Sequence, residues 1–281
     1  MPSVLVTGAG RGIGLAITEH MSGRGWDVYA TVRSDAALHS LDRLPNVHPI
    51  PLDITDRTAI AGLPDRLPAA LSGVVNNAGI IVNGPVEGLA LDELSRQLDV
   101  NVTAQIGVIQ AVLPKIRAGH GRVLFMSSVL GMITMPGSGA YSASKYAIES
   151  LADALRIELR PWRIPVSLIE PGSIRTDMWE DMLDEHDRMT ARLTEQHRDL
   201  YASHLAGNRK LLGRMQKHAG DPKKVVKAVD HALTSKHPKR RYLCDSVSRV
   251  QKTVVSITPT AVNDAVLSAA TTSKSSPRRW S

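Results

Sequence analysis

Two residues that can move a proton stand four positions apart in the segment SGAYSASK at 138–145, namely Tyr141 and Lys145. On a helix, residues four apart share a face, so we expect the phenol and the ammonium to lie side by side. A free tyrosine has a pKa of about 10, and a nearby positive charge lowers that pKa. Because a general acid works best when its pKa approaches the operating pH, the pair is suited to proton transfer. The alternative is a tyrosine and a lysine that merely share a helix surface.

A glycine-rich turn, TGAGRGIG, lies near the start of the chain and contains Gly8, Gly12 and Gly14. It follows an apolar, β-branched run and precedes a helical run, which is the context that a phosphate-binding loop requires. The glycines let the backbone turn sharply and approach a pyrophosphate. The start of the helix, at Ile13, offers free N–H groups and the positive end of the helix dipole. We predict a dinucleotide site here, the alternative being a tight loop without a ligand.

The residues after the second predicted strand indicate which dinucleotide is bound. NAD-binding proteins place an acidic residue about 20 residues beyond the glycines, at the end of that strand. Here the strand ends ATVRS, so that Val32 stands at the acidic position and Arg33 follows it. Arg33 and Arg11, without a carboxylate, suit a 2′-phosphate and favour NADP(H) over NAD(H). Asp35 would reverse this prediction if the strand ended two residues later.

Short apolar runs alternate with helical stretches through most of the chain. Strands are expected over residues 3–8, 27–33, 47–55, 71–79, 121–128, 164–172 and 240–245. Helices are expected from residue 12 onward and over 91–116, 141–160 and 221–235. Strands that alternate with helices are typical of a parallel sheet covered on both faces, and right-handed crossovers make it doubly wound. We therefore predict a Rossmann-like α/β fold with about seven strands.

Several further motifs occur in a fixed order, namely LDIT with Asp53, NNAG at 76–79, DVNVT with Asn101, YSASK at 141–145 and PGSIRT at 171–176. With the glycine-rich turn they resemble the short-chain dehydrogenase/reductase family, in its shorter single-domain branch, over residues 3 to 245. The segment VYATVR is similar to a subgroup of estradiol 17β-dehydrogenases and some retinol dehydrogenases. The resemblance implies an oxidoreductase with a nicotinamide cofactor.

The resemblance also implies four catalytic residues: Tyr141, Lys145, Ser128 and Asn101. Ser128 stands thirteen residues before Tyr141, the family spacing, and would hydrogen-bond the substrate carbonyl oxygen. Its neighbour Ser127 would point the other way, because side chains alternate along a strand. Asn101 would hold a water that links Lys145 to solvent, or it would stabilise a kink in its helix, and both roles are compatible.

Further cofactor contacts are implied by the resemblance. For each of these residues, the alternative to a cofactor contact is a structural role in a turn or in the core. At the adenine ring and its ribose they are Asp53, Ile54, Asn77, Ala78 and Gly79. Around the nicotinamide and the pyrophosphate they are Pro171, Gly172, Ile174 and Thr176. Tyr141 and Lys145 would also touch the nicotinamide ribose, and no metal is expected.

The implied reaction interconverts a ketone or aldehyde with an alcohol. NADPH would deliver hydride to the carbonyl carbon, Tyr141 would protonate the oxygen, and Lys145 would lower the tyrosine pKa and bind the ribose. The alternative is a catalytically idle protein that senses NADPH or regulates a partner. The presence of Tyr141, Lys145, Ser128 and Asn101 together argues against it.

A single domain is expected over residues 1–262, with a substrate lid at about 177–220. Within the lid, Met178, Trp179 and Met182 line a pocket for a lipophilic carbonyl compound, or they form the buried face of a helix, and the sequence leaves both open. Residues 263–281 are predicted to be a basic, disordered tail.

Charge and cysteine usage indicate location and partners. The net charge is +7, and residues from Tyr201 onward hold 16 Lys and Arg against 4 Asp and Glu. This basic region would suit a membrane surface or an acidic carrier protein, and the alternative is an ordinary solvated surface. Nucleic-acid binding is not expected, because aromatic residues make up only 4%. A single Cys244 and the first strand at Ser3 indicate a cytoplasmic protein without a targeting segment. The family implies a homodimer or homotetramer.

Overall fold

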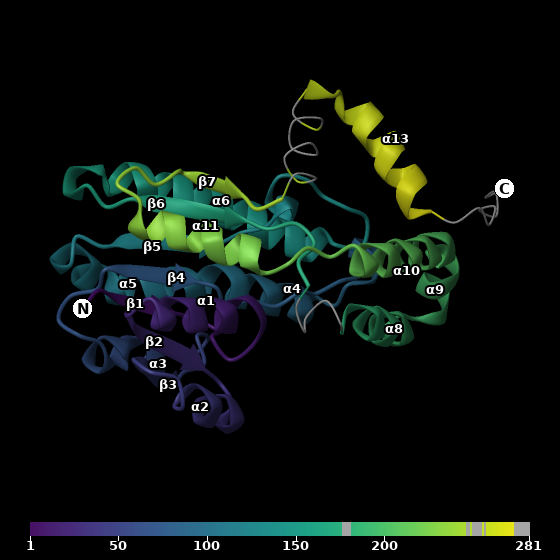
Figure 1. Cartoon of the computed structure of the whole chain (residues 1–281). Coiled ribbons are helices and arrows are strands. Elements are labelled where there is room, and N and C mark those ends of the chain that lie inside the picture. The colour runs from purple at the N-terminus through teal and green to yellow at the C-terminus, as the bar shows by residue number, and fades with distance from the viewer. Residues whose placement is uncertain (176–180, 246–247, 249–254, 256, 273–281) are drawn as a thin grey trace.

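Seven parallel strands form one sheet in the computed structural model, which describes residues 1–175, 181–245, 248, 255 and 257–272 (Figure 1). The strand order is β3-β2-β1-β4-β5-β6-β7, which confirms the predicted doubly wound sheet. The chain reverses its direction of winding between β1 and β4, and ligands bind at such a switch point. The strands are β1 Ser3–Val6, β2 Asp27–Val32, β3 Val47–Pro51, β4 Gly73–Asn76, β5 Arg122–Met126, β6 Val166–Glu170 and β7 Arg241–Leu243.

Helices cover both faces of this sheet (Figure 1). On one face lie α1 (Gly12–Gly23), α2 (Asp35–Leu41) and α11 (Lys223–Thr234). On the other face lie α3 (Arg57–Gly62), α5 (Ala104–Ala118) and α6 (Gly139–Glu158). Short 3₁₀ turns connect several elements: η1 Leu63–Arg66, η2 Val86–Gly88, η4 Val129–Gly131 and η5 Arg160–Trp162.

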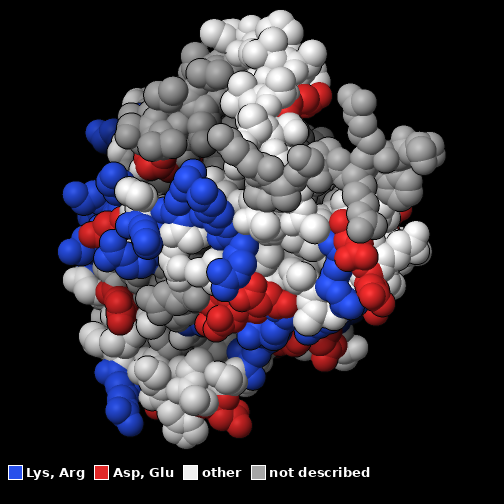
Figure 2. Space-filling model, turned by 90° about the vertical axis from the view of Figure 1, so that its right-hand side faces the viewer, with Lys and Arg blue, Asp and Glu red and all other residues white. Residues whose placement is uncertain are grey.

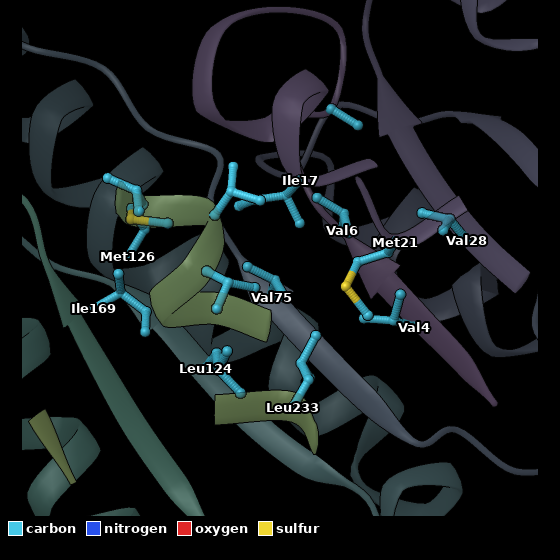
Figure 3. Packing of buried hydrophobic residues seen from close by; sticks show 14 of the residues in the cluster. Val4, Val6, Ile17, Met21, Val28, Val75, Leu124, Met126, Ile169 and Leu233 are labelled. Atoms are coloured by element: carbon cyan, nitrogen blue, oxygen red, sulfur yellow. The ribbon is translucent and has the colours of Figure 1, made fainter. Parts of the chain in front are cut away.

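The core beneath α1 and α11 explains why the sequences of the strands are continuous runs of apolar residues (Figure 3). Val4, Val6 and Val75 point from β1 and β4 toward Met21 of α1 and Leu233 of α11. All five side chains are buried. Strands of a parallel sheet face helices on both sides, so that both alternating sets of side chains must be apolar.

The helix predicted over 91–116 is interrupted in the structure. It divides into α4 (Leu91–Leu98), a π-helical turn η3 (Asp99–Thr103) and α5. The turn contains Asn101, whose buried side chain bonds to the loop after β4. A π-turn inside a helix adds a residue and frequently marks a functional site. The sequence motif DVNVT therefore corresponds to a local distortion of the helix.

A smaller group of helices extends from the carboxyl ends of the strands (Figure 1). It comprises α8 (Met182–Arg192), α9 (Glu195–Leu200), α10 (Ala202–Lys217) and α13 (Thr260–Thr271). The first three cover most of the predicted lid.

The helix α13 differs from the prediction for residues 263–281. It forms over the first part of the expected tail, because its end packs closely on α10. A Cβ atom at Gly207 of α10 would lie only 2.1 Å from the carbonyl oxygen of Thr271. Residues 273–281 lie outside the described part of the chain.

The face that carries this group of helices shows little net concentration of charge (Figure 2). Lys and Arg side chains alternate with Asp and Glu over its lower part, and its uppermost part is almost uncharged. Among the described residues no helix has the length and apolarity needed to span a membrane. Binding of an acidic partner or a membrane surface by the basic C-terminal region stays a prediction.

The helix α6 leaves three large apolar side chains on the surface. Tyr146, Leu151 and Ile157 are exposed by 44%, 38% and 59%. Association of two or four copies through this helix, as the family implies, stays a prediction.

Candidate active site

A cavity of about 1380 Å³ lies along the carboxyl ends of the strands, where the topology changes. It exceeds the roughly 300–1,000 Å³ of an ordinary small-molecule pocket, so it has room for a dinucleotide and a second ligand. One end is formed by the glycine-rich turn and the other by α8, α10 and α13. The predicted catalytic residues Ser128, Tyr141 and Lys145 line it between these ends.

The glycine-rich turn has the backbone geometry that its sequence predicts. Gly8 and Gly12 have φ values of +64° and +57°, in the left-handed region that favours glycine. A Cβ atom at Gly14 would lie 2.2 Å from the carbonyl oxygen of Gly8, so no side chain fits there. Arg11 is extended at the start of α1, and its exposed guanidinium lies 3.7 Å from Asp181. Gly8, Arg11, Gly12, Ile13 and Gly14 all line the cavity.

The NNAG segment fastens this turn to β4. Asn77 donates from Nδ2 to the carbonyl oxygens of Thr7 and Gly8, at 3.0 and 3.1 Å. The backbone N–H groups of Asn77 and Ala78 both donate to the Thr7 hydroxyl. Asn77, Ala78 and Gly79 all line the cavity. The hydrogen bonds of Asn77 and Ala78 show that these two residues also stabilise the turn itself.

Beside the glycine-rich turn, β2 ends at Val32 and Arg33 follows it, as predicted. Asp35 begins α2, so it does not take the acidic position at the end of the strand. The carboxylate that lies near Arg33 is Asp53. Its pKa is lowered by hydrogen bonds from the backbone and side chain of Thr55 and, less, by Arg33. Ser34 lines the cavity beside Arg33 and was missed, although its place directly after Arg33 marks it.

The helix α6 begins just before Tyr141 and places it on the same face as Lys145. The Lys145 Nζ lies 5.5 Å from the centre of the tyrosine ring and donates to the carbonyl oxygen of Met126 at 2.7 Å. Ser128 is the last residue before η4. Its hydroxyl accepts from the N–H of Leu130 at 3.2 Å and donates to the carbonyl oxygen of Pro171 at 3.4 Å, and it lies close enough to Tyr141 to act on the tyrosine pKa. The three predicted side chains are therefore brought together.

The pKa of Tyr141 corrects one expectation. Burial raises this pKa to about 12, and the hydrogen bond with Ser128 opposes the rise. The net direction is therefore opposite to the one expected from Lys145, whose own ammonium is buried and bonded to the Met126 carbonyl. Burial lowers the pKa of Lys145 to about 8, and the negative charge of Glu149 opposes that fall.

Ser127 and Ser128 point in different directions, as their alternation on the strand predicts. The Ser127 hydroxyl lies 3.0 Å from the position that a Cβ atom of Gly131 would take. The Cγ atom of Glu149, on α6, lies 3.1 Å from the same Cβ position. Ser128 instead faces Tyr141, so it is the serine placed to meet a substrate.

Asn101 is fully buried behind the catalytic face. Its Oδ1 accepts from the N–H of Ile80 at 2.8 Å, and its Nδ2 donates to the Ile80 carbonyl and to the Ser144 hydroxyl. Gln97, one turn earlier, bonds to the backbone of Ile80 and Val82. Ser144 in turn donates to the carbonyl oxygen of Tyr141 at 2.7 Å. The Asn101 side chain therefore supports α6 and the loop after β4.

Ser144 and Gln97 were missed at the sequence level. Ser144 stands within YSASK, where it reads only as a small residue. Gln97 stands four residues before Asn101, and this i, i+4 spacing of two amides is the signal that was available.

The loop after β6 forms part of the cavity wall. Pro171, Gly172 and Ile174 line it, and the N–H of Gly172 donates to Asp245 at 3.1 Å. Ile174 is buried and pairs with Gly220 in an isolated bridge. Thr176, Met178 and Trp179 lie outside the described residues. Asp53 and Ile54 also line the cavity, at its adenine end.

The outer end of the cavity is lined mainly by apolar side chains, with His186, Asn208, His218 and Asn263 among them. Of the predicted lid residues, Met182 lines it. Most of α13 lies in the segment that was predicted to be a tail. Further apolar residues from α8, α10 and α13 line this end of the cavity: Met189, Leu205, Leu211, Leu212, Met215, Val262, Val266 and Leu267.

Comparisons with known proteins agree with this geometry. A family model described as short chain dehydrogenase matches residues 2–187. Human retinol dehydrogenase 5 is 32% identical over 277 residues, which cover 94% of this chain and 87% of that protein. An NADPH-dependent 3-dehydrocapnine reductase of Ornithobacterium rhinotracheale is 37% identical over 191 residues, 64% of this chain and 68% of that protein. A crystal structure of a short-chain dehydrogenase from Streptomyces avermitilis has a TM-score of 0.76 at 26% identity, covering 96% of this chain and 98% of that one.

The chain belongs to the short-chain dehydrogenase family, as its motifs indicated. It is a nucleotide-binding oxidoreductase with a Rossmann-like fold and a small-molecule substrate.

Proposed function

We propose that this protein is an NADP(H)-dependent oxidoreductase that reduces a lipophilic ketone or aldehyde, and oxidises the corresponding alcohol in reverse. The placement of Ser128, Tyr141 and Lys145 in the wall of one cavity carries the proposal, since they lie between the glycine-rich turn and the mainly apolar outer end, which we call the apolar chamber. A bound carbonyl oxygen that meets both hydroxyls would be polarised by one and protonated by the other.

The residues around the turn fit a nicotinamide dinucleotide. The space beside Gly14 excludes any side chain, and the N-terminus of α1 presents free N–H groups to a pyrophosphate. Arg33, with no acidic residue at the end of β2, favours a 2′-phosphate. The relative from Ornithobacterium, whose name includes NADPH dependence, supports the same choice. When bound, the nicotinamide supplies or takes up the hydride at the substrate carbon.

The chain's own residues supply the proton and orient the reactants. Tyr141, with a pKa of about 12, is protonated at neutral pH, so it holds the proton that the carbonyl oxygen requires. Ser128 donates a hydrogen bond to the same oxygen and fixes its direction. Lys145, with a pKa of about 8, is mostly charged at pH 7, and its ammonium is placed to bind ribose hydroxyls and to stabilise the phenolate that remains.

The apolar chamber supports a lipophilic substrate. Its methionine and leucine side chains come from α8 and α10, and α13 adds valine and leucine. Apolar surface of this kind gains free energy when it covers an apolar ligand. The retinol dehydrogenase among the relatives is named for such a compound.

The test is NADPH oxidation with carbonyl compounds of increasing size and apolarity: cyclohexanone, decanal, a steroid ketone and retinaldehyde. The variant Tyr141→Phe should lose turnover by roughly 10²–10⁴-fold, which is the usual contribution of a general acid, and should keep NADPH affinity. Tyr146→Phe is the matched control, because Tyr146 lies on the same helix and is 44% exposed.

Each outcome separates the candidate functions. Turnover that rises with apolarity and disappears in Tyr141→Phe supports the proposal and ranks the substrates. Activity of Tyr141→Phe within about tenfold of the wild type would remove Tyr141 from the mechanism. Tight NADPH binding with no turnover on any compound would favour a nucleotide-sensing protein.

A further inference from the structure

Behind the catalytic face, α6 carries a buried carboxylate that the proposed reaction does not use. Glu149 stands four residues after Lys145, one helical turn further along the same face, and is 8% exposed. Its stem packs where a Cβ atom of Gly131 would lie, beside Ser127. It is therefore held against η4, the turn that directly follows Ser128.

The hydrogen bonds of Glu149 leave one of its oxygens available. Oε2 accepts from Nε of Arg241 on β7 at 3.1 Å. Oε1 is buried and has no hydrogen-bond partner among the described residues. Arg241 also bonds to Asp153 at 2.7 Å and to Glu170 at 3.2 Å, so it does not depend on Glu149 for a partner. A buried carboxylate without full compensation is unfavourable unless another positive charge lies near it.

Lys145 is the buried positive charge one turn away. It is 4% exposed, and its Nζ bonds to a neutral carbonyl, that of Met126. The other titratable groups around this part of α6 are Tyr141 on the helix itself, Asp153 one turn beyond, Glu170 of β6 and Arg241 of β7. Among them, Glu149 supplies the negative charge that acts on Lys145.

We infer that Glu149 is a positioning residue that keeps the buried Lys145 ammonium charged in the catalytic site. The inference rests on the proposed function, in which a charged Lys145 binds the ribose and stabilises the phenolate. Arg241 bonds to one oxygen of Glu149, and the other oxygen is buried on the helix that carries Lys145. A neutral residue at 149 would leave a desolvated ammonium without a counter-charge, and Lys145 would lose its proton at a lower pH.

The pH dependence of the activity should reflect the charge on Lys145. A reaction that requires charged Lys145 proceeds below the pKa of this lysine and is lost as the pH rises through it. Burial already lowers this pKa to about 8. Removal of the Glu149 charge lowers it further, so the alkaline limb of the activity profile moves toward neutral pH.

The experiment compares Glu149→Gln with Asp153→Asn and Glu149→Asp. The titration of Lys145 is followed by NMR on protein labelled at the lysine ¹³Cε, with the signal assigned by its loss in Lys145→Met. In Glu149→Gln the midpoint should fall by roughly one pH unit, which a neighbouring charge commonly produces. The alkaline limb of NADPH-dependent turnover should fall with it. Asp153→Asn, which removes a different carboxylate bonded to Arg241, should leave both midpoints unchanged.

Glu149→Asp keeps the charge on a shorter stem and should give an intermediate shift. A folded Glu149→Gln protein with the wild-type lysine midpoint would overturn the inference, as would activity reduced equally at every pH. If Glu149→Gln does not fold, an unshifted midpoint in Glu149→Asp would overturn it instead. The NMR titration needs no turnover, so it stays informative even if Tyr141→Phe is active and the proposed function fails.

Discussion

Four hydrogen bonds from Asn77 and Ala78 tie the glycine-rich turn to β4, whereas α13 meets the remainder of the molecule chiefly along α10. Both regions line the same cavity, at opposite ends. At the dinucleotide end, the backbone itself forms the binding surface, through positive φ values and close approaches. At the chamber end, apolar side chains from separate helices form it.

This difference indicates how each end tolerates change. A surface built from backbone admits almost no substitution, because an added atom meets another backbone atom that cannot move. A surface built from side chains admits many sequences of similar volume and polarity, so specificity can change while the fold stays the same. Three substitutions test this comparison, two at the dinucleotide end and one at the chamber end.

Gly14→Ala should give the largest effect, because the new methyl group would lie 2.2 Å from the Gly8 carbonyl oxygen. We expect loss of NADPH binding in a fluorescence titration and a lower melting temperature. The matched control is Gly23→Ala at the end of the same helix, where nothing lies within 4 Å. That change should preserve binding. Unchanged NADPH affinity in Gly14→Ala would show that the turn is not the phosphate site.

Arg33→Ala should reduce NADPH affinity by roughly ten- to a hundredfold, which corresponds to the 1.5–3 kcal/mol of a hydrogen bond to a charged group. NADH affinity should change little, since NADH lacks the 2′-phosphate. Arg43→Ala is the control, because Arg43 is exposed and does not line the cavity. Equal losses for both nucleotides would contradict the NADP(H) assignment.

Gly207→Ala should act only at the chamber end. A methyl group there would lie 2.1 Å from the Thr271 carbonyl oxygen, so α13 must shift away from α10. The KM for retinaldehyde should rise by roughly tenfold, at the low end of the 1–3 kcal/mol that apolar pocket contacts provide. The KM for cyclohexanone should not change. Gly213→Ala on the same helix, with nothing within 4 Å, is the control.

If both KM values respond equally to Gly207→Ala, then α13 does not contact the apolar part of the substrate. If neither responds, the chamber end tolerates even backbone displacement. The contrast between the two ends of the cavity would then be greater than the structure alone indicates.

The motifs of the dinucleotide end were predictable because each of them specifies a local geometry. A glycine in the left-handed region, a strand that ends at Val32 and a tyrosine four residues before a lysine are all properties of neighbouring residues. Their order along the chain then matched one family. The seven strands and the residues at their carboxyl ends were predicted for the same reason.

Three other features were not predictable from local pattern. The split between α4 and α5 depends on Asn101 and Gln97 reaching the backbone of a loop about twenty residues earlier. The contact of Glu149 with Arg241 joins α6 to a strand 92 positions later. The expected low pKa of Tyr141 reversed, because sequence shows the neighbouring charge but not the burial that outweighs it.

The amino-acid sequence was sufficient to predict the fold and the family, because strand periodicity, glycine conformation and helical spacing act over a few residues. The burial of the candidate catalytic residues and the walls of the apolar chamber are visible only in the folded chain. Both depend on which distant segments exclude water from a side chain, and α13 shows this, since its apolar residues gain a role only where they lie across from α10.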